Sequence, residues 1–394
     1  MRYFNYLCAD DEKARFYLPP QHIPVQDRSI LQYALGATLY MPATRKTVTQ
    51  DIISGKLKGL MSMVLCLEDA IGDNEVTVAE NLLGYHFQQL AIAIERGLVE
   101  PADIPLLFVR IRDVSQMQRV MELLVDNTRF LTGFVFPKFT TNNGRSYLQT
   151  LAELNVGRLT PLYGMPIIES PEAIYVESRP AVLREIKDLL DRYHDLVLNI
   201  RIGATDFSGI YGLRRSPELT IYDILPIGQC IADIVNVFCR PDSSYVVSGP
   251  VWEFYSSERV FKPQLRQSPF TDNLGKAGDR LRNSLLCRYM DGLIHEILLD
   301  KANGLIGKTI IHPSHIKPVQ ALCVVTHEEY MDACSILAHD SGDVGVMPSL
   351  YANKMNEIKP HRQWAQNIML KSKIYGVFNE QQNFTSMLGT EILL

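Results

Sequence analysis

The chain has 394 residues, of which 46% are hydrophobic and 21% are charged, and its formal net charge is -5. This length allows a large core, either in two or three domains or in one α/β barrel of about 250 residues with additions at its ends. The mildly acidic balance gives no electrostatic reason to expect binding to nucleic acid or to an anionic membrane surface.

The sequence also indicates a compartment. No apolar stretch is long enough to span a bilayer, and the N-terminal residues include acids where a signal peptide needs an apolar core. The seven cysteines form no CxxC pair, and most of them lie in apolar runs, which is typical of buried free thiols in a reducing environment. We therefore expect a cytoplasmic protein that binds neither membrane nor nucleic acid.

Eight short apolar runs predict strands, and amphipathic stretches between them predict helices. The runs are nearly continuous rather than alternating, which is typical of parallel strands that are covered on both faces. In chain order, the predicted strands are residues 37–43, 62–70, 105–113, 132–139, 164–170, 196–207, 245–254 and 305–314. The clearest helical patterns between them are residues 77–98 and 180–195.

Eight strands alternating with helices predict an α/β fold of the TIM (β/α)8 barrel type, with a doubly wound sheet as the main alternative. We place the barrel, with a short N-terminal segment, in residues 1–325. Residues 326–394 are expected to form a C-terminal helical extension, with helices in 326–339 and 361–378 and a Gly/Pro-containing link between them. The extension would pack on the barrel or on a neighbouring subunit, and we expect a homo-oligomer.

Charged side chains stand where successive predicted strands end. In a barrel, these ends meet at the face that carries the chemistry. Carboxylates there supply the hard oxygen ligands that Mg²⁺ prefers, and an arginine offers a planar fork for a substrate carboxylate. The residues at these positions are Glu68, Asp69, Arg110, Arg112, Lys138, Glu169 and Asp206.

Each of these residues alone has a plainer interpretation. Glu169 can begin a loop before a helix capped by Ser170, Arg112 and Asp113 can form a surface ion pair, and Asp206 can cap a turn. The set favours a shared site, because five successive predicted strands each end with a charge.

Six motifs in order resemble one known family, the citrate lyase beta-subunit and malyl-CoA lyase family of aldolase-like enzymes. The motifs are "LCLEDAIGDNEVTVAENL", "FVRIRD", "GFVFPKF", "PIIESPEAI", "IRIGATDFSGIYG" and "NGLIGKTIIHPSHIKPV". The resemblance covers about residues 35–340 and implies magnesium-dependent carbon–carbon lyases on a TIM barrel. The tail "KMNEIKPHRQWAQNIMLKSKIYGV" resembles a divergent branch whose genes accompany tellurium-resistance and stress-response operons.

The resemblance implies roles for five residues. Glu169 and Asp206 match the two direct Mg²⁺ ligands of the family. Arg110 matches the arginine that holds the keto acid carboxylate or the developing enolate. Glu68 and Asp69 match an acidic pair that orients water and the substrate, and these three residues are our candidate catalytic group.

Two further cations complete the expected substrate-binding set. Lys138 matches the lysine of the family's "PK" motif at the end of the next strand. Arg112 stands where the family has "RIN", so it adds a positive charge near the pocket. The acids of residues 291–304 can be a solvated helix face or substrate contacts.

One departure from the family concerns coenzyme A. After "LEDA" the family carries a lysine and then an arginine one helical turn later, whereas this chain has Val76 and Glu80. Two lost cations make recognition of a CoA thioester doubtful.

These observations favour a metal-assisted retro-aldol or retro-Claisen cleavage of a small keto or hydroxy acid, or the reverse condensation, through an enolate. The sequence does not identify a general base. An alternative is a phosphoenolpyruvate-type enolate enzyme, with a phosphate site built from Arg112, Lys138 and residues 43–47. A non-catalytic barrel subunit of a stress-response complex is a third possibility, which the loss of a metal ligand would favour.

Overall fold

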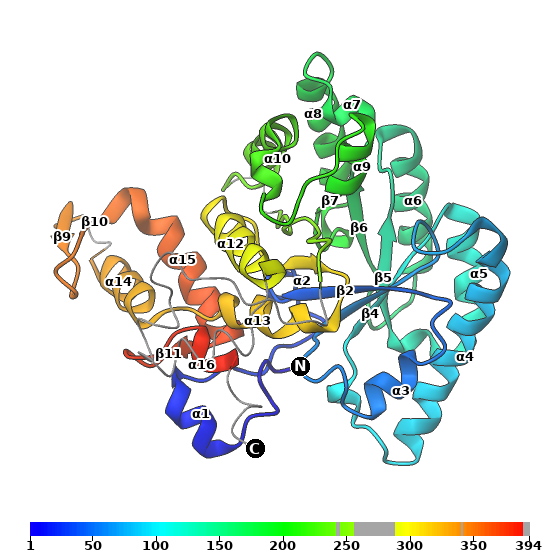
Figure 1. Ribbon diagram of the computed structural model, residues 1–394, viewed down its shortest axis with the longest axis horizontal. Coiled ribbons are helices and arrows are strands. Elements are labelled where there is room, and N and C mark those ends of the chain that lie inside the picture. The colour runs from blue at the N-terminus through cyan, green and yellow to red at the C-terminus, as the bar shows by residue number, and fades with distance from the viewer. Residues whose placement is uncertain (242–244, 256–287, 340–341, 389–394) are drawn as a thin grey trace. The chain divides into compact units, whose positions relative to one another are not determined.

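Seven parallel strands form one curved sheet in the order β7-β6-β5-β4-β3-β2-β8 (Figure 1). The computed structural model describes residues 1–241, 245–255, 288–339 and 342–388. The sheet strands are β2 (Ala37–Pro42), β3 (Ser62–Cys66), β4 (Leu106–Arg110), β5 (Leu131–Phe136), β6 (Tyr163–Ile168), β7 (Arg201–Ile202) and β8 (Lys308–Ile310). Nearly every residue of these strands is buried, as expected for parallel strands covered on both faces.

Residues 245–249 close this sheet into a barrel. They form parallel bridges on both sides, from Val247 to Ile200 next to β7 and from Gly249 to Lys308 of β8. The seventh predicted strand, residues 245–254, is therefore present as a short bridging segment rather than as a long strand. The strands follow one another around a ring in chain order, so the predicted (β/α)8 barrel is confirmed and the doubly wound alternative is wrong.

Helices follow the strands, and some of them begin at a residue whose side chain caps the helix. Asp113 caps α5, because its Oδ1 accepts a hydrogen bond from the backbone N–H of Gln116 at 2.7 Å. Thr140 and Asn143 form a capping box at the start of α6. The helices are α2 (Arg28–Leu31), α3 (Val48–Ile53), α4 (Val76–Glu95), α5 (Val114–Leu124), α6 (Thr141–Leu154), α7 (Pro171–Ile174), α8 (Arg179–Asp191), α9 (Ala204–Ile210), α10 (Leu225–Phe238) and α12 (Arg288–Ala302).

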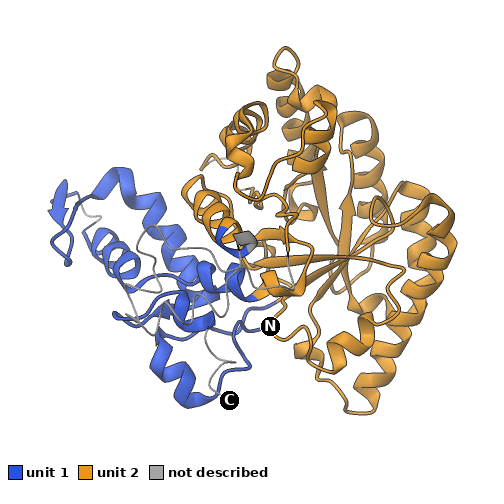
Figure 2. Ribbon diagram, viewed as in Figure 1, with its two compact units in different colours: residues 1–24, 256–291, 317–394 blue, residues 25–255, 292–316 orange. Residues whose placement is uncertain are grey.

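The chain divides into two compact units (Figure 2). The first contains residues 1–24, 256–291 and 317–394, and the second, which holds the barrel, contains residues 25–255 and 292–316. The expected division between residues 325 and 326 stays a prediction. The unit that contains the C-terminal helices also takes in the N-terminal segment, which the sequence analysis assigned to the barrel.

The first unit is a mixed α/β structure rather than a set of helices alone. β1 (Phe16–Leu18) pairs antiparallel with β11 (Val377–Phe378), so the two ends of the chain share a small sheet. The helices α14 (His327–Ala338) and α15 (Ile358–Tyr375) pack together through a buried cluster. Its other helices are α1 (Ala9–Arg15), α13 (Ile316–Cys323), which begins one residue before this unit, and α16 (Thr385–Leu388).

The link between α14 and α15 contains a hairpin that the sequence analysis did not predict. β9 (Val346–Pro348) pairs antiparallel with β10 (Met355–Glu357). Both strands are only three residues long, which is too short for a periodic pattern to be recognised. In the part of the chain that the structure describes, no helix is both long and apolar enough to cross a membrane.

A close approach of β5 to β6 requires glycine at one position, and this gives a test of the fold. A Cβ atom on Gly133 would lie 1.9 Å from the carbonyl oxygen of Tyr163. We expect Gly133→Ala to lower the free energy of unfolding by about 1–3 kcal/mol or more, because backbone must move. Gly84→Ala in α4 is the matched control, since its nearest neighbour lies at an ordinary 3.7 Å. Denaturant unfolding of both variants measures the difference, and equal stabilities would contradict the register of β5 and β6.

Candidate active site

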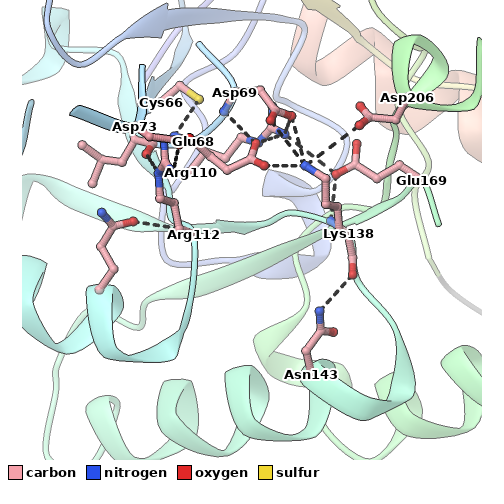
Figure 3. Close-up of polar contacts among 12 residues, drawn as sticks. Cys66, Glu68, Asp69, Asp73, Arg110, Arg112, Lys138, Asn143, Glu169 and Asp206 are labelled. Carbon is pink, nitrogen blue, oxygen red and sulfur yellow. Dashed lines mark hydrogen bonds and ion pairs between the residues drawn. The ribbon is translucent and has the colours of Figure 1, made fainter. Parts of the chain in front are cut away.

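Six of the seven predicted site residues lie together at the carboxyl ends of β3 to β7 (Figure 3). Arg110 is the last residue of β4, and its register partner is Cys66, the last residue of β3. Glu68 follows two residues after Cys66, so the acidic pair and Arg110 meet at the same edge. The two adjacent acids that follow β3 therefore both contact a cation from the neighbouring strand.

The guanidinium of Arg110 contacts three carboxylates. It forms ion pairs with Glu68 and with Asp69, the latter at 2.7 Å, and lies 3.8 Å from Glu169. The side chain of Arg110 is 11% exposed, so solvent screens its interactions with Glu68 and Glu169 only weakly, whereas Asp69 is 51% exposed and its ion pair is screened more. Burial acts to raise the pKa of Asp69, but the hydrogen bond to Glu68 and the charges of Arg110 and Lys138 hold it below its usual range.

Lys138 links the acidic pair to the acids on the other side of the site. Its Nζ lies 2.5 Å from Glu68, 3.3 Å from Asp69 and 4.0 Å from Asp206. Partial burial acts to lower the pKa of Lys138, but its contacts with Glu68 and Asp69 raise it above the usual range. The ammonium group therefore stays charged and is unsuited to act as a general base.

The backbone at Lys138 is strained, and this strain serves the site. Its φ is +48°, in the left-handed region that side-chain-bearing residues rarely adopt. In this conformation its N–H donates a 2.7 Å hydrogen bond to Glu169 Oε1, and its carbonyl accepts one of 2.9 Å from Asn143 Nδ2. The turn after β5 thus fixes the carboxylate of Glu169 as well as the lysine.

Glu169 and Asp206 lie side by side at the ends of β6 and β7. Burial raises the pKa of Glu169 to about 8, and the adjacent carboxylate of Asp206 adds to the increase through its charge and a hydrogen bond between the two side chains. Gly203 makes room for this arrangement, since a Cβ atom there would lie 2.0 Å from Glu169 Oε2. Glu169 is only 4% exposed, whereas Asp206 is half-buried.

These two acids border a pocket of about 320 Å³ in the barrel mouth. Arg110 and Asp69 also line it, and Ile167, Ile202, Val251 and Ile311 give it partly apolar walls. A space of this size with a few convergent polar groups is typical of a site for a small ligand.

The donor set fits a magnesium ion. Among the described residues, no three or more His, Cys, Asp and Glu side chains gather as a metal cage. Magnesium does not require one, because it usually takes one or two protein carboxylates and completes its shell with water and substrate oxygens. The adjacent carboxylates of Glu169 and Asp206 are suited to that role. Without a bound cation, the raised pKa of Glu169 means that it holds a proton at neutral pH, and a cation would favour its ionised form.

Arg112 does not join this group. β4 ends at Arg110 and the chain turns, so Arg112 no longer follows the strand's alternation. Its guanidinium donates to the carbonyl of Leu67 and to Asp73 at 2.6 Å, and it does not line the pocket. Arg112 does not form the alternative surface ion pair with Asp113 either. It pairs with Asp73, and Asp113 caps α5.

Two acids of residues 291–304 are neither part of a solvated face nor contacts in the pocket. Glu296 and Asp300 of α12 are buried and both bind Lys308, at 2.9 and 2.7 Å. Arg215 contacts Glu296 and also Glu253, which reaches the pocket wall. This buried network joins α12 to β8 and had no signal in the local sequence pattern.

Two pocket residues were missed by the sequence analysis. Tyr40 on β2 and Arg201 on β7 line the inner part of the pocket. Arg201 is buried, and Tyr40 is partly buried with its hydroxyl group enclosed. Both lie inside apolar runs rather than at the carboxyl ends of the predicted strands, where the predicted site residues stand. An arginine within a predicted buried strand, in "LNIRIGATDF", was the available signal.

A closed (β/α)8 barrel with a charged pocket at the carboxyl ends of its strands is the architecture of a TIM-barrel enzyme. Residues 29–377 match the family described as the C-C bond lyase of the TIM-barrel fold. The chain belongs to this family of carbon–carbon lyases, and the resemblance read from the motifs is confirmed.

Solved structures share the fold at low sequence identity. The CitE protein of Mycobacterium tuberculosis, in complex with magnesium, acetoacetate and coenzyme A, is 16% identical with a TM-score of 0.52, covering 86% of this chain and 99% of that one. A citrate lyase from Burkholderia xenovorans LB400 is 14% identical with a TM-score of 0.58, covering 90% of this chain and 96% of that one. No curated protein matches the chain.

Proposed function

We propose that this lyase is magnesium-dependent and cleaves or forms a carbon–carbon bond next to the carbonyl or hydroxyl carbon of a small acid. The observation that carries the proposal is the charge balance of the site. Four carboxylates, from Glu68, Asp69, Glu169 and Asp206, face two cations, from Arg110 and Lys138. With all six ionised, the deficit is two positive charges, which a divalent cation would supply.

Glu169 and Asp206 would hold the ion, and the magnesium-bound CitE complex with acetoacetate supports a site of this kind on the shared fold. When bound, Mg²⁺ supplies Lewis acidity that stabilises the negative charge of an enolate. Arg110 binds the acid's carboxylate through its guanidinium and spreads the same developing charge. Asp69, kept ionised by its neighbours, would take the hydroxyl proton of a hydroxy acid as the carbon–carbon bond breaks and would return it to the enolate carbon, while Lys138 holds Asp69 in position.

The phosphate-dependent alternative has less support. Of the cations it needs, Arg112 is occupied by Asp73, and Arg45 of residues 43–47 donates to Asp51 at 2.6 Å. Lys138 is engaged by the acidic pair. The non-catalytic alternative loses its basis because the chain belongs to a lyase family and both proposed metal ligands are present. Roles in tellurium resistance and in a homo-oligomer remain predictions.

The metal site is tested by removing one ligand at a time. Glu169→Gln and Asp206→Asn each remove a carboxylate charge and should weaken Mg²⁺ binding by more than about 100-fold. Loss of a residue that only supports a metal ligand lowers metal affinity by at most about this factor. Glu172→Gln is the matched control, because this nearby acid on α7 is exposed and outside the pocket. Calorimetric titration with Mg²⁺ measures all three, and unchanged affinity in both ligand variants would refute the site.

The role of Arg110 is tested with a charge-preserving change. Arg110→Lys keeps the positive charge but removes the planar fork, so we expect pyruvate to bind about 1–3 kcal/mol more weakly in the presence of Mg²⁺. Arg112→Lys makes the same chemical change outside the pocket and should leave pyruvate binding unaltered. The reverse pattern in a binding titration would show that the wrong arginine has been assigned.

Coenzyme A recognition is predicted to be weak or absent. Val76 begins α4, and Glu80 one turn later is held by Gln116 at 2.8 Å and by Arg119 at 3.3 Å, so negative charge stands where the family has cations. We expect no micromolar binding of acetyl-CoA at low ionic strength, where attraction to its phosphates is least screened.

A double variant supplies the control for this expectation. Val76→Lys with Glu80→Arg restores both cations and should gain measurable, salt-sensitive affinity for acetyl-CoA. Micromolar binding of acetyl-CoA by the unaltered protein would instead identify an ordinary CoA-dependent lyase.

A further inference from the structure

Arg201 is a buried cation with no acidic partner. It is 1% exposed and lies on β7, and no carboxylate among the described residues is within ion-pair distance of it. Its Nη1 donates to Thr309 Oγ1 at 3.1 Å, its Nη2 donates to Thr38 Oγ1 at 2.7 Å, and its guanidinium lies 5.9 Å from the ring centroid of Tyr40. Hydroxyl groups and an aromatic face compensate a buried guanidinium less well than a carboxylate does.

The other buried cations of the described chain do not share this feature. Arg179 contacts Asp233, Lys308 contacts two acids of α12, and Arg215 contacts Glu253 and Glu296. Each of these three buried cations, which lie outside the pocket, is thus paired with at least one carboxylate. Arg201 departs from that rule, and it is the one among them that lines the pocket.

Two polar atoms in the inner part of the pocket have unused hydrogen-bonding capacity. Arg201 Nε and the hydroxyl of Tyr40 are buried and have no hydrogen-bond partner. Buried groups of this kind are rare in folded proteins, and a site that receives a ligand is one place where they occur. A single carboxylate accepts from both an N–H and an O–H, whereas a doubly charged phosphate would call for more than one cation.

These groups lie deeper in the barrel than the proposed metal ligands. Arg201 pairs in register with Ile167, two residues before Glu169, and its guanidinium reaches the sulfur of Met165, a further two residues back. Tyr40 interacts electrostatically with Arg110, Arg201 and Glu169, so it lies between the outer and inner charges. The same pocket therefore has a cation at each end, with apolar walls between them.

We propose that Arg201 and Tyr40 form a second carboxylate-binding subsite at the inner end of the pocket, so that the substrate is a short keto or hydroxy acid with a carboxylate at each end. Arg110 binds one carboxylate beside the metal ligands, and Arg201 binds the other. This inference rests on the proposed function for the outer end and adds the substrate class.

Matched pairs of acids test the inner subsite. With Mg²⁺ present, the unaltered protein is titrated with 2-oxoglutarate and with 2-oxopentanoate, which replaces the far carboxylate by a methyl group. Malate and 2-hydroxybutyrate form a second, shorter pair. We expect the dicarboxylate of at least one pair to bind ten times more tightly or better than its monocarboxylate.

Two variants assign that preference to the subsite. Arg201→Met should reduce the affinity for the dicarboxylate to that of its monocarboxylate, and Tyr40→Phe, which removes only the hydroxyl, should reduce the preference several-fold. If Arg201→Met does not fold, the preference of the unaltered protein and of Tyr40→Phe still decides the matter.

The outcomes separate the two proposals. Equal affinity for both members of both pairs would overturn the inner subsite and leave the proposed function intact. The same holds if a preference exists but neither variant reduces it. Failure of all four acids to bind with Mg²⁺ present would reject the proposed function and the subsite with it.

Discussion

The contact of Arg110 with the acids of neighbouring strands is the interaction on which the site depends. Carboxylates that are largely removed from water repel one another unless cations lie among them. Arg110 reaches Glu68, Asp69 and Glu169, and Lys138 completes the arrangement from the next strand end. The two cations gather the acids without neutralising them, and this remaining negative charge makes the site suitable for a divalent cation rather than for an anion alone.

A second charged network holds the barrel closed behind the site. Lys308 of β8 is fully buried and binds Glu296 and Asp300 of α12, and Arg215 binds Glu296 from the opposite direction. Gly249 leaves room for this network, since a Cβ atom there would lie 2.4 Å from Asp300 Oδ2. The short segment 245–249 closes the ring through backbone hydrogen bonds on both sides, for example from Ser248 to Ile200 and from Gly249 to Gly307, each at 3.0 Å. The ion pairs between α12 and Lys308 add to this closure.

The parts of the structure that depend on local pattern were predictable, and those that depend on distant pairings were not. Continuous apolar runs predicted the strands, and the charges after them predicted which side chains meet, because parallel strands end on one face. Arg112 was misplaced because the pattern does not reveal that β4 stops two residues earlier. Arg201 was missed because its surroundings come from Thr38 and Thr309, 163 and 108 residues away in the chain.

The location of Arg201 is itself an argument for function. An apolar residue at this position would pack among Ile167, Met165 and the face of Tyr40 without the cost of burying a charge. Proteins depart from such local consistency mainly where activity requires it, and the stability of the remaining fold offsets the departure. The large buried core of this barrel supplies that stability, so an arginine can stand in its interior with a hydrogen-bond donor left free. A bound carboxylate would complete the pairing that the fold leaves open.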